Sequence, residues 1–531
     1  MALLVILLVA TALRLHGIDW DGGIGAHPDE RYVVGLSDNL AWPDRLNPFQ
    51  LAPQYAYGHL PVYLLAATRV LAPGADSILP GRAIAGLCDV ATVALTFALA
   101  RRLCDRRVGL LAAAFAALTV LHVQQAHFYT ADSLLGFLTL AALLFATRLA
   151  EGSRATDAWF AGAWAGLALG TKASAALLAF PLAAACSLAS RKRQGCYWRV
   201  GLAAIGAFAL TNPFALINPR VFARNVAGQA AIVRGLLVVP YTWQYRDTLP
   251  YIYPVVQQLR WGIGWIPGLV GLGALVLAVG RTVRTPPRAG EWVILAWALP
   301  SIAFVGALYA KFPRYLLPLT PLLGVYAAAL VVDLTWPRRW LLHASSIALL
   351  GPMLFRCLLL VGPYGSPHPW LAASDWFCEN VEPGATIATE EWDHPLPLDA
   401  TGYDVRQLPV FEPETPAKWT EIEATLKDAD YLVIASRRAY ATLGRLSEAF
   451  PRTSGYYQRL FDGELAFEPV ACHSRSPGPT GLVLVDDPTS GLAFDLPASC
   501  RAGAMWILIG HLDESFVVYD RPQVLVFKAL P

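Results

Sequence analysis

The sequence predicts a polytopic α-helical membrane protein of about eleven transmembrane helices, followed by a C-terminal extracytoplasmic α/β domain. Three observations lead to this fold class. The 531 residues are 56% hydrophobic and only 15% charged, with a mean hydropathy of +0.45, whereas soluble domains carry about 25% charged residues. Long apolar runs separated by arginine-rich loops fill residues 1–361, which we expect to be embedded in the membrane. Residues 365–531 are richer in Pro, Gly, Asp and Glu and carry only short apolar runs, which is typical of a soluble domain.

The apolar runs are the expected spans, because a helix needs roughly 20 apolar residues to cross a bilayer. Residues 158–189 could form one long helix or two short helices that meet at Gly170-Thr171-Lys172. The positive-inside rule places both 151–157 and 190–199 in the cytoplasm, which favours two passes with Lys172 at the outer tip. The expected spans are 2–18, 81–100, 108–124, 132–149, 158–170, 173–189, 200–217, 262–280, 291–309, 315–333 and 340–361.

Basic residues between the spans predict the orientation. If the first helix starts in the cytoplasm, four basic clusters fall on the cytoplasmic side. The HPDE loop, residues 218–261 and everything after 362 then face outward. The four clusters are Arg101, Arg102, Arg106 and Arg107; Arg191, Lys192, Arg193 and Arg199; Arg281, Arg284 and Arg288; and Arg338 and Arg339.

Two long outer loops, 19–80 and 218–261, each contain an apolar run that is typical of a helix lying along the membrane surface. These runs are PVYLLAATRVL at 61–71 and VFARNVAGQAAIVRGLL at 221–237. Loops of this length are usually functional.

In the C-terminal part, strand-like runs alternate with helical ones, which predicts a small α/β domain. The expected strands are ATIATE (385–390), YLVIAS (431–436), GLVLVDD (481–487) and QVLVFKAL (523–530), and the expected helices are 419–429 and 438–450.

Several function classes can be set aside. The net charge of +2 is uninformative, and no basic patch with interleaved aromatic residues suggests nucleic acid. The eight cysteines show no spacing typical of a zinc site. Most lie in apolar segments, where cysteine is usually a small core residue. Cys378, Cys472 and Cys500 leave room for one disulfide in the polar part.

The run His27-Pro28-Asp29-Glu30 follows the first span directly and places two carboxylates at the membrane surface. A carboxylate there can take a proton from an acceptor hydroxyl or hold a metal ion. No cofactor is predicted with certainty. Asp29 and Glu30 are the candidate ligands if a divalent metal ion binds. A polar loop that caps a helix is the alternative interpretation of this run.

Charged residues at the ends of membrane spans are costly and usually functional. Lys and Arg suit an anionic phosphate, and Arg can grip it with two hydrogen bonds. The outward-facing candidates are Asp29, Glu30, Arg82, Asp132, Lys172 and Arg314.

Each candidate has a structural alternative. Arg82 could extend from the start of a helix to the membrane surface without binding a ligand. Asp132 could be an N-cap, and Arg314 and Tyr315 could anchor the chain at the membrane interface. His59, in YGHLPVY, is more typical of a loop residue than of a ligand. Asp89 is expected to pair with a residue inside the bundle.

At these positions the chain resembles the polyprenyl-phosphate-dependent glycosyltransferases of the GT-C fold. The resemblance is to glycosyltransferase family 39, the protein O-mannosyltransferase and lipid A aminoarabinose transferase relatives. It covers about residues 1–361, and HPDERY and RYLLPLTPLLG are its most specific elements. It rests on HPDERY (27–32), GRAIAGLCDVATV (81–93), HFYTADSLL (127–135), GTKASAALLAFP (170–181) and RYLLPLTPLLG (314–324).

The resemblance implies an inverting glycosyltransferase in the cytoplasmic membrane. The donor would be a polyprenyl-phosphate sugar, and the acceptor a hydroxyl on a glycan, lipid or protein at the outer face. In this interpretation Asp29, with Glu30 beside it, activates the acceptor. Lys172, Arg314 and Arg82 bind the donor phosphate. The substrate site is completed by His27, Asp132, Tyr129, Tyr315 and His59.

Two other function classes remain open. A transporter or lipid flippase would also carry intramembrane charges, but such proteins tend to show repeated halves and sites near the bilayer midplane. A non-catalytic glycan-binding surface protein would need no carboxylates in its first loop. Convergence of Asp29, Asp132, Lys172 and Arg314 on one outward cavity would separate these classes.

Overall fold

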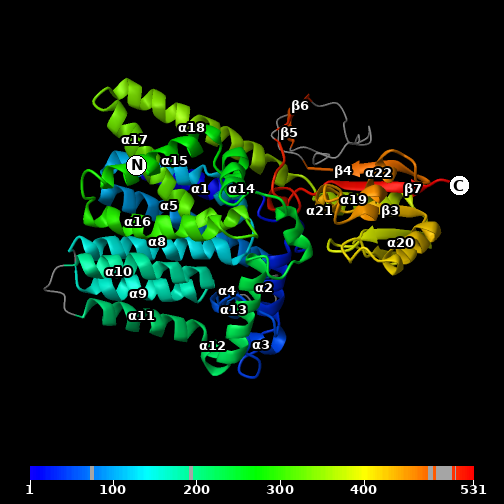
Figure 1. Ribbon diagram of the computed structural model, residues 1–531, viewed down its shortest axis with the longest axis horizontal. Coiled ribbons are helices and arrows are strands. Elements are labelled where there is room, and N and C mark those ends of the chain that lie inside the picture. Colours follow the sequence, from blue (N-terminus) through cyan, green and yellow to red (C-terminus); the bar gives the residue numbers. More distant parts are fainter. Residues whose placement is uncertain (72–76, 153, 190–194, 476–481, 486–504, 509) are drawn as a thin grey trace. The chain divides into compact units, whose positions relative to one another are not determined.

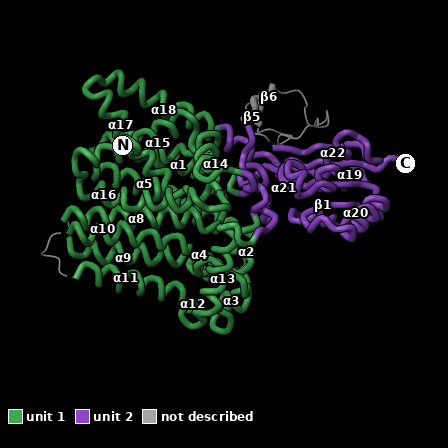
Figure 2. Tube along the Cα trace, in the orientation of Figure 1, with its two compact units in different colours: residues 1–18, 28–237, 248–358 green, residues 19–27, 238–247, 359–531 purple. Residues whose placement is uncertain are grey.

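A computed structural model describes residues 1–531 except 72–76, 153, 190–194, 476–481, 486–504 and 509. The chain forms two compact units (Figure 2). Unit 1 comprises residues 1–18, 28–237 and 248–358, and unit 2 comprises residues 19–27, 238–247 and 359–531. Unit 2 thus takes in short segments of the two long loops, 19–80 and 218–261, as well as the C-terminal part.

Unit 1 is a helical bundle (Figure 1). Its first half contains α1 (Ala2–Leu15), α2 (Pro28–Asp38), α3 (Pro48–Leu51), α4 (Leu60–Leu71), α5 (Ile78–Leu103), α6 (Arg106–Ala117), α7 (Val120–Ala126), α8 (Ala131–Ala150), α9 (Thr156–Leu169), the 3₁₀ helix η1 (Ala173–Leu178) and α10 (Ala179–Leu188). Its second half contains α11 (Cys196–Thr211), α12 (Pro213–Ile217), α13 (Pro219–Val233), α14 (Ile252–Gln257), the π-helical turn η3 (Gln258–Gly262), α15 (Trp265–Thr282), α16 (Ala289–Gly306), the 3₁₀ helix η4 (Pro313–Leu319), α17 (Thr320–Thr335) and α18 (Arg339–Val361).

Each of the eleven expected spans coincides with a helix or a pair of consecutive helices. Within the described residues, six helical segments are long and apolar enough to cross a membrane, or up to seven if the bent pair α6 and α7 is one span. Four further apolar helices are shorter, among them α1, α11 and the η1–α10 pair. The chain breaks between α9 and η1 at Gly170-Thr171-Lys172, so residues 158–189 form two helices rather than one.

Small residues let neighbouring helices approach closely. A Cβ atom added at Gly162 would lie 2.3 Å from the carbonyl oxygen of Val200, and one at Gly166 would lie 2.2 Å from that of Ala204. Both glycines are on α9 and both carbonyls are on α11. Close backbone approach at small residues is the usual way in which membrane helices gain packing energy without a hydrophobic driving force.

A buried ion-pair network joins α1, α5 and α7 inside the bundle. Arg14 Nε lies 2.6 Å from Asp89 Oδ2, and His122 Nδ1 lies 2.5 Å from Asp89 Oδ1. Arg14 also donates to the carbonyl oxygens of Ala116 and Ala117 at 3.3 and 3.0 Å. Asp89 therefore has the partner inside the bundle that the sequence predicts. The network lies where α6 ends and the chain bends by 57° into α7.

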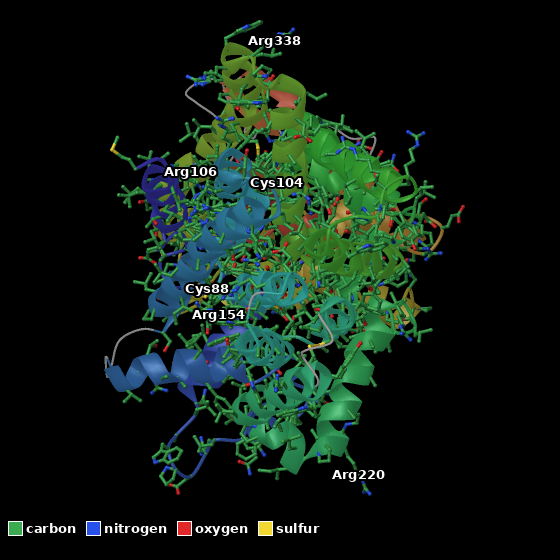
Figure 3. All side chains as sticks on the ribbon, turned by 90° about the vertical axis from the view of Figure 1, so that its left-hand side faces the viewer. Cys88, Cys104, Arg106, Arg154, Arg220 and Arg338 are labelled. Atoms are coloured by element: carbon green, nitrogen blue, oxygen red, sulfur yellow. A yellow bond between two sulfur atoms is a disulfide. The ribbon has the colours of Figure 1, made fainter. Side chains whose placement is uncertain are left out.

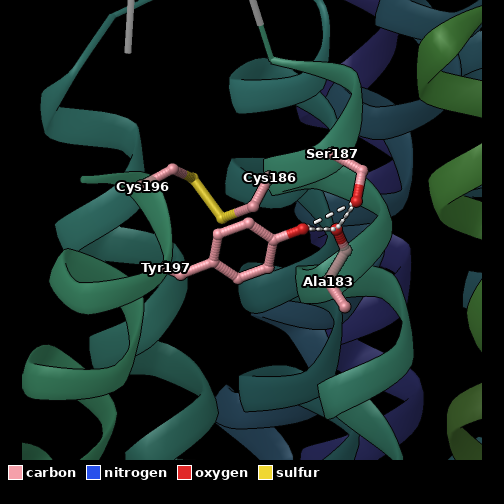
Figure 4. The surroundings of a disulfide bond; sticks show 5 residues. All are labelled: Ala183, Cys186, Ser187, Cys196 and Tyr197. Atoms are coloured by element: carbon pink, nitrogen blue, oxygen red, sulfur yellow. Dashed lines mark hydrogen bonds between the residues drawn. A yellow bond between two sulfur atoms is a disulfide. The ribbon is translucent and has the colours of Figure 1, made fainter. Parts of the chain in front are cut away.

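One disulfide lies within the apolar segments, where the sequence predicts only core cysteines. Cys186 at the end of α10 is bonded to Cys196 at the start of α11, with 5.6 Å between the Cα atoms (Figure 4). Beside it, Tyr197 Oη and Ser187 Oγ are 2.7 Å apart. Cys378 is free and Cys472 is disulfide-bonded, whereas Cys500 lies outside the described residues, as do Arg191, Lys192 and Arg193.

Unit 2 contains a mixed five-stranded sheet with strand order β2-β1-β3-β7-β4. β1 pairs in parallel with β2 and β3, and β7 pairs antiparallel with β3 and β4. The strands are β1 (Thr386–Glu390), β2 (Asp404–Leu408), β3 (Tyr431–Ile434), β4 (Phe467–His473) and β7 (Val524–Ala529). A separate parallel pair is formed by β5 (Leu482–Val485) and β6 (Met505–Leu508).

Helices complete unit 2: η2 (Pro240–Tyr245), η5 (Gly362–Gly365), α19 (Pro369–Asn380), α20 (Pro416–Asp428), α21 (Arg438–Leu443), α22 (Pro451–Phe461) and η7 (Glu514–Phe516). The four expected strands are present as β1, β3, β5 and β7, although residues 481, 486 and 487 of the third run lie outside the described residues. The expected helix 438–450 is wrong in length, because α21 ends at Leu443 and a turn follows. β2, β4 and β6 were not predicted from the sequence.

Candidate active site

Asp29 lies in the first turn of α2, directly after Pro28. Proline is well suited to the first position of a helix, since its missing N–H would have no partner there. The HPDE run is thus a helix start and not an extended loop. The Asp29 side chain is 29% exposed, so solvent or a substrate can reach it, and its Oδ2 lies 2.8 Å from an Nη atom of Arg314.

Glu30, the neighbouring carboxylate, has a different environment. Its side chain is fully buried and accepts two hydrogen bonds from Arg82, at 2.9 and 2.7 Å, and one from the backbone N–H of Tyr129 at 2.8 Å. Arg82 is equally buried and also donates to the carbonyl oxygen of Ile18. This pairing favours a structural role for both side chains over the predicted catalytic role of Glu30 and the predicted phosphate-binding role of Arg82. Both side chains are already engaged with each other and sealed from solvent.

Asp132 and Lys172 form the second ion pair of the site. Asp132 is in the first turn of α8, two residues after the N-cap residue Thr130, so it is not itself the N-cap. Its Oδ1 lies 2.8 Å from Nζ of Lys172. Lys172 has extended backbone at the break between α9 and η1, and its Nζ lies 5.7 and 5.0 Å from the ring centroids of Tyr57 and Tyr315.

Gly58 explains how Lys172 is positioned. The backbone N–H of Gly58 donates to the carbonyl of Thr171, and that of Leu60 donates to the carbonyl of Gly170. A Cβ atom added at Gly58 would lie 1.9 Å from the oxygen of Gly170, so any other residue would push the two segments apart. The YGHLPVY run therefore fixes the turn that carries Lys172.

Arg314 joins the two ion pairs. It lies in the short 3₁₀ helix η4 after Pro313, and its side chain is only 7% exposed. Besides Asp29, its Nε lies 3.8 Å from Asp132 Oδ2, and its guanidinium stands 4.7 Å from the ring centroid of Phe312. Four charges from four distant parts of the chain, two carboxylates and two cations, thus form one continuous cluster.

A cavity of about 210 Å³ opens beside this cluster. Asp132, Lys172 and Arg314 line one part of it. The remaining walls are mostly apolar and come largely from α13 and the end of α16. They include Val226, Ala230, Val233, Phe304, Val305 and Leu308. A cavity with charge at one part and apolar walls elsewhere suits an amphiphile with a polar head and a hydrocarbon chain.

The other predicted substrate residues are placed as follows. Tyr315 lines the cavity. Tyr129 is buried, and its Oη donates to the carbonyl of Pro61 at 2.7 Å, which indicates a structural role. His27 is buried in unit 2, where its ring lies 4.3 Å from that of Tyr519. His59 is buried among the rings of Phe49, Tyr55 and Tyr63, and burial lowers its pKa to about 4.

Tyr57 and Gln229 are among the cavity residues that the sequence did not predict. Tyr57 lines the cavity beside Lys172, and burial together with the nearby Asp29 raises its pKa. Gln229 is a polar lining residue on α13. The signals were present as a tyrosine directly before Gly58 and as a single glutamine among the small and apolar residues of the second half of α13.

A metal site made by Asp29 and Glu30 together has no support in this geometry. Their carboxylates engage different arginines. Across the described residues, no group of three or more His, Cys, Asp or Glu side chains could hold a metal ion.

Comparisons with known proteins agree with the resemblance found in the sequence. A family profile described as dolichyl-phosphate-mannose-protein mannosyltransferase matches residues 59–238. A search of curated proteins gives no match. The matched range includes Asp132 and Lys172 but not Asp29 or Arg314.

Solved structures that are similar to this chain include those of the following two proteins. The archaeal oligosaccharyltransferase AglB from Archaeoglobus fulgidus, in complex with an inhibitory peptide and a dolichol-phosphate, matches with a TM-score of 0.56 and 15% identity, over 86% of this chain and 72% of that chain. ArnT from Cupriavidus metallidurans in the apo state matches with a TM-score of 0.50 and 15% identity, over 88% of this chain and 95% of that chain. The chain therefore has the fold of the GT-C glycosyltransferases, whose members are multi-pass membrane proteins.

Proposed function

We propose that this protein is an inverting glycosyltransferase. It would move a sugar from a polyprenyl-phosphate donor to an acceptor hydroxyl at the outer face of the cytoplasmic membrane. One observation carries the proposal. Asp29, Asp132, Lys172 and Arg314, predicted from separate parts of the sequence, form one charged cluster beside a cavity with apolar walls.

The cations are suited to the donor. The phosphate would lie against Lys172 and Arg314, and the first isoprene units would follow the apolar walls from α13 and α16. Arg314 offers a planar fork and Lys172 a compact charge, and charge-assisted hydrogen bonds of this kind are stronger than neutral ones. Both cations now contact carboxylates, so donor binding requires them to exchange one anionic partner for another.

Asp29 is the proposed base because it is the carboxylate that an acceptor can reach. It takes the proton from the acceptor hydroxyl, whose oxygen bonds to the anomeric carbon as the bond from that carbon to the phosphate oxygen breaks. The polyprenyl phosphate leaves as an anion held by Lys172 and Arg314, where negative charge develops. A single displacement from the opposite face inverts the anomeric configuration.

This mechanism links the two halves of the site. While Arg314 holds Asp29, the carboxylate is engaged in an ion pair and is less available for a proton. A donor phosphate that draws Arg314 away would release Asp29 only when the sugar is in place. The matched family description and the dolichol-phosphate bound to AglB support a lipid-phosphate donor. A transporter or flippase and a non-catalytic glycan-binding protein are the competing classes.

The test is label transfer by the purified full-length protein. A panel of radiolabelled polyprenyl-phosphate sugars is incubated with envelope glycans, lipids and proteins. We expect one donor to be consumed, and Asp29→Asn to reduce transfer by about 100-fold, as for loss of a general base. The control is Asp44→Asn, an exposed aspartate of the same outer loop that does not line the cavity.

The rival classes give different results. Movement of an intact lipid donor across a vesicle membrane without transfer would indicate a flippase. Glycan binding without turnover would indicate a non-catalytic protein. Full activity of Asp29→Asn would show that the proposed base is wrong even if transfer occurs.

A further inference from the structure

A second, larger crevice lies at the opposite ends of helices that carry the active site. Its volume is about 860 Å³. Asp132 is in the first turn of α8, whereas Glu151 of the crevice directly follows the last turn of that helix. Likewise α16 contributes Phe304 to the active-site cavity and Glu291 to the crevice. Since α8 has 20 residues at about 1.5 Å each, the two sites are about 30 Å apart along that helix.

The crevice has apolar walls made by two membrane helices. α15 and α17 pack tightly at one level, where a Cβ atom added at Gly271 would lie 3.2 Å from Leu323 Cβ. Beyond that level they present alanine, valine and leucine side chains to the crevice. The apolar lining residues of the two helices include Ala274, Leu277, Ala278, Val325, Ala329 and Leu330. These side chains leave a slot in which a hydrocarbon chain can lie.

The mouth of the crevice carries charges of both signs. Two of its carboxylates already have partners: Glu151 pairs with Arg102 at 2.6 Å, and Asp105 accepts from the backbone N–H groups of Arg107 and Val108. The other charged lining residues are two cations, Arg281 and Arg288, and two carboxylates, Glu291 and Asp333. Within the described part of the chain, none of Arg281, Glu291 and Asp333 makes an ion pair.

We infer that this crevice binds a phospholipid with a zwitterionic headgroup that has a primary amine, of the phosphatidylethanolamine class. The phosphate would lie against Arg281 and Arg288, and the ammonium group would donate to Glu291 and Asp333. An anionic lipid would leave both carboxylates unpaired. A quaternary choline headgroup prefers an aromatic cage, and Tyr326 is the one aromatic side chain among the crevice residues described.

The leaflet follows from the arginine-rich turns. Arg102, Arg281 and Arg288 belong to the clusters that the positive-inside rule places in the cytoplasm. Figure 3 looks onto the face of the molecule that carries Cys104, Arg106 and Arg338. The site is therefore assigned to the inner leaflet, far from the outward cavity, and it does not depend on the proposed glycosyl transfer.

The first experiment measures lipid binding by native mass spectrometry of the delipidated full-length protein, with phosphatidylethanolamine, phosphatidylcholine and phosphatidylglycerol of the same acyl chains. We expect selective binding of phosphatidylethanolamine. The double variant Glu291→Gln, Asp333→Asn should weaken it about tenfold while leaving phosphatidylglycerol unchanged or tighter, and Arg281→Gln, Arg288→Gln should weaken both lipids. The matched control is Arg284→Gln, an exposed arginine of the same turn that does not line the crevice.

A second readout uses cysteines already in the chain. Cys104 is free, exposed and lines the crevice, whereas Cys378 is free and exposed in unit 2. Added phosphatidylethanolamine should slow alkylation of Cys104 by N-ethylmaleimide severalfold without affecting Cys378. Equal binding of all three lipids, no change in the site variants, or equal protection of Cys104 by water-soluble glycerophosphoethanolamine would overturn the inference.

Discussion

Asp29 and Glu30 are adjacent in the sequence but have opposite surroundings. Glu30 is sealed in the protein with Arg82, whereas Asp29 is partly exposed and contacts the cavity residue Arg314. The presence of two carboxylates in HPDE was readable from the sequence. The different environments of the two carboxylates could not be predicted, because each depends on an arginine that is distant in the sequence. Arg82, the partner of Glu30, is more than fifty residues away, and Arg314, the partner of Asp29, is nearly three hundred residues away.

The Glu30–Arg82 pair should act on stability. Removing one partner of a buried ion pair leaves an uncompensated charge, which costs about 3–5 kcal/mol. We expect Glu30→Gln and Arg82→Gln each to lower the thermal unfolding temperature in detergent, and the double variant to be less destabilised than the sum of the two. Asp29→Asn, whose carboxylate is partly solvated, should unfold within a few degrees of wild type. Strict additivity would show that the two side chains are not coupled.

Lys172 and Arg314 should bind one phosphate together. We expect Lys172→Ala and Arg314→Ala each to weaken binding of a polyprenyl phosphate by about 1.5–3 kcal/mol, the range for hydrogen bonds to charged groups. The two effects should be non-additive, because both cations share one ligand. Arg314→Lys should not restore affinity, since the fork geometry is lost.

Asp132 complicates this cycle, because it contacts both cations in the unliganded protein. The cycle is therefore repeated in an Asp132→Asn background. Coupling that persists there comes from the phosphate, and coupling that vanishes there comes from Asp132. The control is Arg220→Ala, an exposed arginine on α13 outside the cavity lining.

At the scale of elements, apolar length was enough to place a helix at each expected span but not to predict where the helices are interrupted. The break at Gly170-Thr171-Lys172 was predicted, since charge on both sides required it. The bend between α6 and α7 was not, because Arg14 of another helix takes the carbonyls of Ala116 and Ala117. Helix bends with such a non-local cause leave no signal in their own residues.

The strands of unit 2 show the same limit. β3 and β7 have central positions in the sheet and nearly continuous apolar runs, so their sequences predict them. β2 and β4 are the edge strands, with the polar sequences DVRQL and FEPVACH. An edge strand buries less side-chain surface than a central one. Whether a polar segment forms an edge strand therefore depends on the neighbouring strand that it pairs with and not on its local sequence.

Glu390, the last residue of β1, should make unit 2 sensitive to pH. It is buried and accepts a hydrogen bond from Tyr457 Oη at 2.8 Å, and burial raises its pKa to about 8. Between pH 4.5 and 8 the unfolded chain releases this proton while the folded chain keeps it, so the free energy of unfolding falls as pH rises and levels off above pH 8.

The measurement compares the thermal unfolding of Glu390→Gln and wild type across this pH range. The quantity of interest is the unfolding temperature of the variant minus that of wild type at the same pH. We expect this difference to be several degrees larger at pH 8.5 than at pH 5, because the amide carries no proton to lose. Glu382→Gln, at an exposed position of the same unit, is the control. A pH-independent difference between Glu390→Gln and wild type would contradict the assignment.

At the scale of the whole molecule, the division into units was less predictable than their content. Composition places the change near residue 365, yet unit 2 also contains residues 19–27 and 238–247. The ring of Trp20 contacts the rings of Tyr364 and His368, and the backbone carbonyl oxygen of Trp20 accepts hydrogen bonds from the guanidinium of Arg475. These contacts join residues more than 300 positions apart, and only tertiary structure reveals them.

The orientation of the chain is the remaining large-scale prediction. With eleven crossings and the first helix starting in the cytoplasm, an odd count places residues after 362 outside. Alkaline phosphatase fused after Pro531 should be active, and green fluorescent protein at the same point should be dark. Fusions in the turn 283–288 should give the reverse pattern.

The disulfide provides a second test of the orientation, since Cys186–Cys196 joins the end of α10 to the start of α11 beside the basic segment expected in the cytoplasm. Disulfides are rare in that reducing compartment, so we expect both thiols to be reduced in cells and to bond only after extraction in air. A disulfide already present in freshly alkylated cells, together with an inactive phosphatase fusion, would mean that the whole bundle is inserted the other way round.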